Sequence, residues 1–500
     1  MKKLRKFGIA EWAAPLILSV SLLLIPEQSH GQKFYPDIAP IIWENCSNCH
    51  RTGQAGPFPL LEYEDVRKRG RQIADVISDG YMPPWHATSK DLHFKDDRRL
   101  DPETKDLLTR WIEADMPLGD PSLAPEKPVF NNDWYGGKPD LVVSMPEPYE
   151  VYAEGRDIYR NFVLPLNNTE TLYLKAIEIR PSSRPVVHHV LYFLDTTGAA
   201  RSRDARDPLP GFQGMGFTSG LTGIGGWAVG GTPVPLPEGM AFVLPPGSDI
   251  VLQTHFHPTG KIEMEATTLG LYLSEEAPTR EFSGIQLPPR FGALAGVDIP
   301  PGEKDYRVYD SFEIPVNLQA FGISAHAHYL GKALWMKATK PDGSELELLR
   351  IDDWDFNWQE GYTFREPVVL PAGTRVDAMV SWDNSAENPA NPHNPPQRVR
   401  WGPFSYDEMG SVTLRVSPIE NGDISLLRER LSEHQTLAVA DTMLKSSSRR
   451  SSERLNFFQK RILQFDRNEN GKFDPDEKSE LVDTIRKLKL RFGERLNNSF

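Results

Sequence analysis

Apolar and polar residues alternate in short segments over most of the region between Asp140 and Pro418, and Gly and Pro separate these segments. Successive side chains of a β-strand point to opposite faces, so this alternation predicts half-buried strands. Clear examples are 171–179, 249–255 and 412–416. This β-region is longer than one sandwich requires, so we expect two all-β domains, over 126–275 and 276–418.

The length of the chain requires further domains, because a single domain usually holds about 100–200 residues and this chain has 500. A hydrophobic fraction of 39% supplies enough apolar surface for several cores. The 56 Lys and Arg residues are outnumbered by 69 Asp and Glu residues, which gives a net charge of -13. Binding to nucleic acid depends on neutralising phosphates, so nucleic acid is not an expected partner.

The chain has only two cysteines, and Cys46, Cys49 and His50 form the C-x-x-C-H motif of covalent haem attachment. In this motif two thiols bind the porphyrin and the imidazole ligates the iron. A thioether is a common second axial ligand, and Met82 stands before two prolines that would keep its loop rigid. We therefore expect a small all-α, cytochrome c-like haem domain over 32–125, with helices over 63–78 and 102–115.

Two alternatives remain open at this motif. His86 and His93 are rival axial ligands, because histidine binds haem iron as well as methionine does. The two cysteines could instead form a disulfide or half of a zinc site, although the chain has no second pair of cysteines to complete such a site.

Histidines occur in three pairs within the predicted β-region, at 188 and 189, at 255 and 257, and at 326 and 328. A strand repeats every second residue, so His326 and His328 point to one face and can bind one ion. Adjacent His188 and His189 can bind one ion only if the strand bulges or ends there. A single histidine in a sheet is usually structural, but three pairs in one β-region favour a transition-metal site.

The motifs that carry these histidines resemble those of the copper type II, ascorbate-dependent monooxygenases. They are His-Ala-His-Tyr-Leu-Gly-Lys at 326–332, the His188-His189 pair, Leu-Gln-Thr-His255 and Tyr-Asp-Glu-Met409. That family includes peptidylglycine alpha-hydroxylating monooxygenase and dopamine beta-monooxygenase. Gly-Gln-Ala-Gly-Pro-Phe-Pro-Leu and Met-Pro-Pro-Trp, near the haem motif, are similar to cytochrome c modules that precede copper monooxygenase domains.

The resemblance implies two jelly-roll-like antiparallel sandwiches that bind two copper ions. His188, His189 and His255 would hold an electron-donating copper, and His326, His328 and Met409 the catalytic copper that binds O2. The implied enzyme inserts one oxygen atom into a C–H bond of a small organic substrate. Its electrons would come from ascorbate or another one-electron donor, with the haem and a redox partner protein as further sources.

This sequence departs from the peptide-amidating members at several positions. Those members have an Arg two positions before the first His of His-x-His, where this chain has Ser324. They also have Tyr and Asn after the methionine ligand, where this chain has Thr413 and Ser411. Peptide amidation is therefore not expected. His257 matches no ligand of the family; it either orients His255 or is a turn residue before Pro258.

The C-terminal tail, 419–500, contains a match to the twelve-residue calcium loop of an EF-hand at 466–477. The predicted oxygen ligands are Asp466, Asn468, Asn470, the carbonyl of Lys472, Asp474 and Glu477. Helix-compatible stretches flank the loop at 453–465 and 476–491. A single EF-hand of this kind is either a structural clip or a calcium sensor.

The N-terminus has the pattern of a secretory signal peptide over 1–31. A basic start is followed by an apolar run from about Ala13 to Ile25 and then by small residues. The run is short for a bilayer span, which needs about 20 apolar residues. We expect an exported protein, periplasmic or secreted, without a transmembrane segment in the mature chain; retention of this segment as an anchor is the alternative.

Three functions follow from these features. The first is an exported copper-dependent monooxygenase with a built-in haem. The second is a non-catalytic haem and copper protein that transfers electrons or binds copper. The third is a haem sensor whose β-region binds a carbohydrate or a protein. Substrate-dependent consumption of O2 separates the first from the others.

Overall fold

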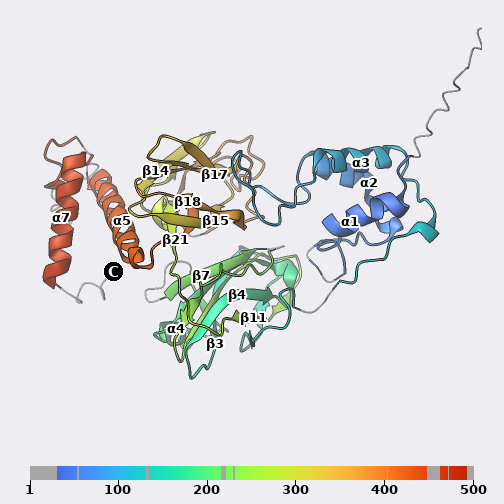
Figure 1. Ribbon diagram of the computed structural model, residues 1–500, viewed down its shortest axis with the longest axis horizontal. Helices are drawn as coiled ribbons and strands as arrows, with labels where there is room; N and C mark the ends of the chain where they lie inside the picture. The colour runs from blue at the N-terminus through green and yellow to red at the C-terminus, as the bar shows by residue number, and fades with distance from the viewer. Residues whose placement is uncertain are drawn as a thin grey trace, which may run out of the picture.

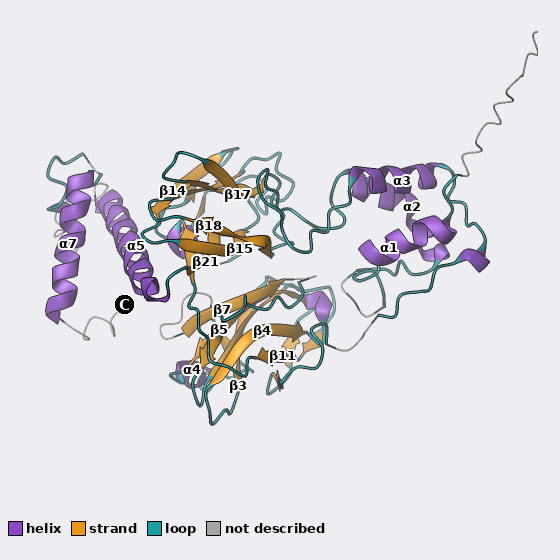
Figure 2. Cartoon of the chain, viewed as in Figure 1, coloured by secondary structure: helices purple, strands orange, loops and turns teal. Residues whose placement is uncertain are grey.

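The computed structural model describes residues 31–52, 54, 56–130, 134–214, 221–228, 231–402, 404–447, 462–470 and 472–492. More of these residues lie in strands than in helices, and the strands form antiparallel sheets arranged like sandwiches, with helices before and after them in the chain (Figure 1). Figure 2 shows this division into helical and β parts. The predicted signal peptide lies outside the described residues, except for Gly31.

The N-terminal part is helical, and its elements share one apolar core that includes Phe34 and Trp111. Side chains set where the helices begin: Glu62 and Asp65 form a capping box at α2, and the Asp101 carboxylate accepts a backbone hydrogen bond of 2.8 Å at α3. The elements are η1 (Phe34–Ile38), α1 (Ala39–Asn45), α2 (Tyr63–Ser78), α3 (Pro102–Glu113) and η2 (Pro121–Leu123). The helix predicted over 63–78 is observed with these bounds, and the second predicted helix ends two residues early.

The first β-region has two main sheets that enclose one core. Their strand orders are β6-β3-β9-β5-β7 and β1-β11-β4-β8, and β10 pairs separately with β2. β9 is the central strand of the larger sheet and is buried along its whole length. The elements are β1 (Leu141–Ser144), β2 (Tyr149–Val151), β3 (Ile158–Pro165), β4 (Leu172–Arg180), η3 (Arg184–Val186), β5 (Val187–Asp195), α4 (Ala199–Asp204), β6 (Phe212–Gln213), β7 (Leu221–Ala228), β8 (Phe242–Leu244), β9 (Asp249–Phe256), β10 (Glu263–Glu265) and β11 (Thr268–Leu273).

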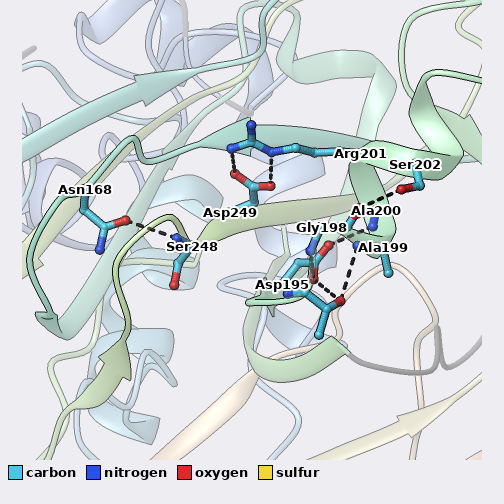
Figure 3. A network of polar contacts seen from close by, with 10 residues as sticks. Asn168, Asp195, Gly198, Ala199, Ala200, Arg201, Ser202, Ser248 and Asp249 are labelled. Atoms are coloured by element: carbon cyan, nitrogen blue, oxygen red, sulfur yellow. Dashed lines mark hydrogen bonds and ion pairs between the residues drawn. The ribbon is translucent and has the colours of Figure 1, made fainter.

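A polar network fixes the register of the two strands that carry the first histidines (Figure 3). Asp195, at the end of β5, pairs directly with Asp249, at the start of β9. Two carboxylates placed opposite each other would repel, but each has its own partners. Asp195 accepts backbone hydrogen bonds at the start of α4, including 2.7 Å from Ala200 N, and Arg201 forms a bidentate ion pair of 2.5 and 2.6 Å with Asp249.

The second β-region is built in the same way, from two four-stranded sheets around a larger core. Their orders are β12-β21-β15-β18 and β14-β19-β16-β17, and β13 pairs with β20. The elements are β12 (Ser283–Leu287), η4 (Pro289–Gly292), β13 (Asp298–Ile299), β14 (Tyr306–Glu313), β15 (Leu318–Ala327), β16 (Gly331–Thr339), β17 (Glu345–Ile351), β18 (Gly361–Leu370), β19 (Arg375–Trp382), β20 (Val399–Arg400) and β21 (Gly410–Pro418).

Residues 85–95, which we call the strap, pack into this second core although they lie between α2 and α3 in the sequence. Trp85 and Phe94 are buried among the side chains of the second β-region. Thr88 and Phe94 also form β-bridges to β17 and β18. The strap therefore joins the helical part to the second β-region by packing, a feature that the sequence did not predict.

The C-terminal helices are η5 (Asn421–Asp423), α5 (Ile424–Ser447) and α7 (Pro475–Phe492). Among them, α5 packs against the second β-region and α7 packs against α5. Ile424 and Leu427 of α5 enter the second core, and His434 Nε2 lies 2.9 Å from Asp310 Oδ2 on β14. The predicted helix over 453–465 lies mostly outside the described residues. Among the described helices, none combines the length and apolar character needed to cross a membrane.

Candidate metal centres

His188 and His189 lie at the start of β5, and His255 lies near the end of β9. A regular strand would point adjacent side chains to opposite faces. The pairing of β5 with β9 shifts register between Val187 and His189, so the strand bulges at His188, and His189 pairs directly with His255. The bulge that two adjacent ligands require is therefore present. We call these three residues the first histidine cluster.

The first histidine cluster has the spacing of a metal site. One nitrogen from each ring lies within 4.8 Å of the others. The Nδ1 atom of His189 is 3.1 Å from Nδ1 of His188 and 3.4 Å from Nδ1 of His255. Two nitrogens bound to one metal at about 2.0–2.1 Å lie roughly 3–3.5 Å apart, so both distances from His189 Nδ1 suit a single transition-metal ion.

Asp157, which the sequence analysis did not identify, orients the third histidine. Its Oδ2 atom lies 2.9 Å from His255 Nε2, and its Oδ1 atom lies 2.9 Å from His257 Nδ1. Ser405, from the second β-region, donates a hydrogen bond of 2.8 Å to the same carboxylate. Burial opposes ionisation of Asp157, but the contacts with His255, His257 and Ser405 outweigh it and hold its pKa well below the usual range.

The sequence left two roles open for His257, orienting His255 or forming a turn. His257 is exposed and contacts Asp157, not the first histidine cluster itself. A carboxylate behind a ligating imidazole fixes the ring and increases its basicity. Tyr159 supports the same ring, stacking on His255 at 4.3 Å and sharing a hydrogen bond of 2.8 Å with Ser405. The first histidine cluster is thus tied to the second β-region through Asp157 and Tyr159.

Replacing Asp157 with asparagine should weaken metal binding at the first histidine cluster by about 10- to 100-fold, because an amide neither carries the charge nor fixes the His255 ring in the same way. A competitive titration of copper against a chelator measures this change. The second histidine cluster in the same protein serves as the internal control. Equal losses at both clusters would show a general folding defect, and unchanged affinity at the first would contradict the role of Asp157.

His326, at the end of β15, and His328, just after it, form the second histidine cluster with Met409. The ring centroids of the two histidines are 5.2 Å apart. Each Nδ1 atom has a protein partner: Gln359 Oε1 at 2.5 Å for His326 and the Asp407 carbonyl at 3.0 Å for His328. Because Nδ1 of each ring is occupied, Nε2 is the atom that each ring would offer to a metal ion.

Met409 lies immediately before β21, and its side chain is only 6% exposed. The register of β15 and β21 pairs Ala327 with Gly410, which brings Met409 beside His328. The neighbouring carboxyl of Glu408 is buried and accepts hydrogen bonds from the backbone of His328 at 3.1 Å and from Leu330 at 2.6 Å. Burial raises the pKa of Glu408 to about 8. This side chain fixes the turn on which the second histidine cluster lies.

Phe356 lies between the two clusters. Its ring stacks on His188 with centroids 4.9 Å apart and meets His328 edge-on at 5.7 Å. On the far side of the second cluster, Phe291 packs edge-on against His326 at 5.2 Å. Phe291 and its neighbour Arg290 both have positive φ angles, 53° and 51°, which residues other than glycine rarely adopt. Strained backbone of this kind is often found at functional sites.

Burial keeps the histidines of both clusters neutral. It lowers the pKa of His188 to about 3 and that of His326 to about 4, although Gln359 partly offsets the effect at His326. The pKa values of His189 and His328 also lie well below the usual range, for the same reason. A metal binds only the neutral imidazole, so these sites are ready to bind ions at neutral pH.

These shifts predict that the copper-free protein loses stability as the pH falls from 7 to 5. The histidines have lower pKa values in the folded chain than the ordinary 6.5, so their stabilising contribution is present above pH 6.5 and is lost as pH falls toward the folded values. For a histidine such as His326, this linkage should lower the free energy of unfolding by about 2 kcal/mol at pH 5. Thermal unfolding across this range measures the effect. His326→Gln should reduce the pH dependence, and an unchanged dependence would contradict this assignment.

The haem motif lies in the turn after α1. Cys46 and Cys49 are not joined by a disulfide, and burial raises the pKa of the Cys46 thiol to about 12. The His50 Nδ1 atom lies 3.1 Å from the Phe58 carbonyl, which orients the ring and leaves Nε2 to bind iron. A Cβ at Gly56 would lie 2.7 Å from the His50 ring, so only glycine fits beside it. The His50 ring is therefore oriented as an iron ligand requires, and covalent attachment of haem stays a prediction.

The predicted axial ligand Met82 lies just after α2, and its backbone N–H donates to the Val76 carbonyl at 3.0 Å. It is partly buried. His86 belongs to the strap and is also partly buried, whereas His93 is exposed and its carbonyl accepts from Arg365 N at 2.8 Å. The choice among these three ligands stays a prediction.

The predicted calcium ligands turn toward the inside of their loop. Asp466 and Glu477 are buried, with exposed fractions of 6% and 3%. The side chains of Asn468 and Asn470 lie 2.7 and 3.2 Å from Asp474, and Glu477 accepts from the backbone N–H of Arg467 at 2.8 Å. The Lys472 N–H donates to the Asn470 side chain at 2.8 Å. An oxygen-rich loop of this kind suits calcium.

Comparisons with known proteins do not assign a family. No protein-family model and no curated protein matches the sequence. Solved structures share only a distant likeness. The major capsid protein P2 of bacteriophage PM2 is 10% identical over 56% of this chain and 97% of its own, with a TM-score of 0.24. PNGF-II is 9% identical over 56% of this chain and 65% of its own, with a TM-score of 0.26. These scores are too low to support an argument.

Proposed function

We propose that this protein is an exported copper-dependent monooxygenase that hydroxylates a C–H bond of a small organic substrate with O2. The observation that carries the proposal is the pair of histidine clusters on two β-regions, with Phe356 between them. A protein that only stored copper would not need two sites with different ligands. The thioether of Met409 favours Cu(I), whereas imidazoles bind both oxidation states.

In this proposal the first histidine cluster holds the electron-donating copper and the second, with Met409, holds the catalytic copper. Copper bound there would supply the one-electron steps and the activation of O2. The chain's own residues keep the imidazoles neutral by burial, orient them through Asp157 and Gln359, and limit water around them with the rings of Phe356 and Phe291.

The other parts of the chain take supporting roles in this proposal. The two β-regions would be jelly-roll-like copper domains, and the helical part would be a cytochrome c-like module with haem on Cys46, Cys49 and His50. The loop 466–477 would bind calcium as an EF-hand. Export rests on the sequence of residues 1–31, which lie almost wholly outside the described part of the chain.

Metal analysis of the haem-loaded chain after copper reconstitution tests the proposal, followed by measurement of substrate-dependent O2 consumption over a panel of small C–H compounds. We expect two copper ions per chain, one for each cluster. Copper binding without any consumption of O2 would favour the electron-transfer or copper-binding alternative. A chain that binds one copper or none would contradict the proposal.

A further inference from the structure

The loop between β17 and β18, residues 352–360, contacts both histidine clusters and the helical part of the chain. Phe356 stacks on His188 and meets His328. Gln359 lies 2.5 Å from His326 Nδ1. Glu360, the last residue of the loop, accepts a hydrogen bond of 2.6 Å from Arg98, which lies beyond the strap. Among the described residues, this short loop thus reaches three separate parts of the chain.

Arg98 ties this loop to the segment that follows the predicted axial ligand, Met82. Besides its ion pair with Glu360, its guanidinium donates to the Pro84 carbonyl at 2.8 Å and lies over the Trp85 ring at 5.2 Å. Pro84 is two residues after Met82. Glu360 is largely buried, with a side chain only 9% exposed, so solvent screens this ion pair less than it screens a surface pair.

A second contact involves the loop that follows the haem motif. Arg184 donates to the Gln54 side chain at 3.0 Å. Gln54 follows the haem motif by four residues, and Arg184 lies just before β5, which carries His188. The loop that follows the haem motif therefore contacts the segment that leads into β5.

We propose that loop 352–360 is the electron-transfer connection between a haem on Cys46 and Cys49 and the copper sites, and that electrons enter at His326. This inference rests on the proposed function. From Arg98 the route runs through Glu360 and the adjoining Gln359 to His326, and it crosses only two hydrogen-bonded contacts. Phe356 gives a short path from the second histidine cluster to the first.

Each transfer moves one electron from ferrous haem iron to Cu(II), which yields ferric iron and Cu(I). An external one-electron donor, such as ascorbate, then reduces the haem again. Two such transfers supply the two electrons that one hydroxylation consumes, and the reductant does not need to reach the copper sites. The geometry thus assigns the helical part the role of built-in donor.

Anaerobic stopped-flow measurement tests the inference, with no substrate present. The haem of the full chain is reduced, Cu(II) is bound, and oxidation of the haem is followed by its absorbance. In the parent protein the rate should be independent of protein concentration, because donor and acceptor are in one chain. Glu360→Ala should slow it by an order of magnitude or more, and Glu360→Gln, which keeps an acceptor for Arg98, should slow it less.

Asp352→Asn is the matched control, since Asp352 is an acidic residue of the same loop that pairs with the exposed Arg350. It should leave the rate unchanged. Copper content and the haem reduction potential are measured on every variant. If both are unchanged, a slower rate reflects a broken electron-transfer path and not the loss of a metal site. A parent rate that rises with protein concentration, or a parent-like rate in Glu360→Ala, would overturn the inference while leaving the proposed function in place. A parent protein without bound copper would overturn both.

Discussion

Replacing His189 with alanine is expected to reduce the copper content from two ions per chain to about one and to abolish hydroxylation. His189 is the central member of the first histidine cluster, with its Nδ1 atom 3.1 Å from that of His188 and 3.4 Å from that of His255. Without it, two imidazoles remain at positions that were set for three ligands. The first site then loses its ion, while the second keeps its own ligands.

Metal analysis after reconstitution and spectroscopy of the remaining Cu(II) measure this outcome. His257→Ala is the matched control, because His257 lies on the same segment of chain but contacts only Asp157 among the residues of this site. It should retain both copper ions. His189→Gln, which leaves a smaller cavity, checks that the loss does not come from misfolding. Retention of both ions in His189→Ala would contradict the first site.

Replacing both Cys46 and Cys49 with serine is expected to remove the covalent haem completely, because serine cannot form the two thioether bonds. Haem staining of the denatured protein measures this directly. The helical core should persist, since large buried side chains such as Phe34 and Trp111 form it and Cys46 is only one of the partly buried residues packed against it. Copper content should remain as in the parent, because the histidine clusters lie on other elements.

The same double variant separates the roles of haem and copper. If the haem is the electron donor, hydroxylation driven by a bulky reductant that cannot reach the copper sites should be lost. A small reductant that reaches them should restore part of it. A single substitution, Cys49→Ser, serves as the control and should leave one thioether bond. Covalent haem in the double variant would contradict the assignment of the motif.

Short-range patterns in the sequence predicted the local structure well. The helix predicted over 63–78 is observed as α2, because the caps and periodicity that define a helix act within a few residues. The alternation at 249–255 predicted the position of β9, but this strand is buried on both faces because it is the central strand of its sheet. The spacing of His326 and His328 predicted one shared face, and their rings lie 5.2 Å apart. These features depend on neighbours in the chain.

The sequence by itself therefore determined the helices, the strands and the histidines that can bind a metal. Only the tertiary structure decided what surrounds them. Asp157 and Ser405 are 248 residues apart, and Arg98 and Glu360 are 262 apart, yet each pair forms a hydrogen bond. No local pattern encodes such partners, because burial in a common core brings them together only after both β-regions and the strap have packed.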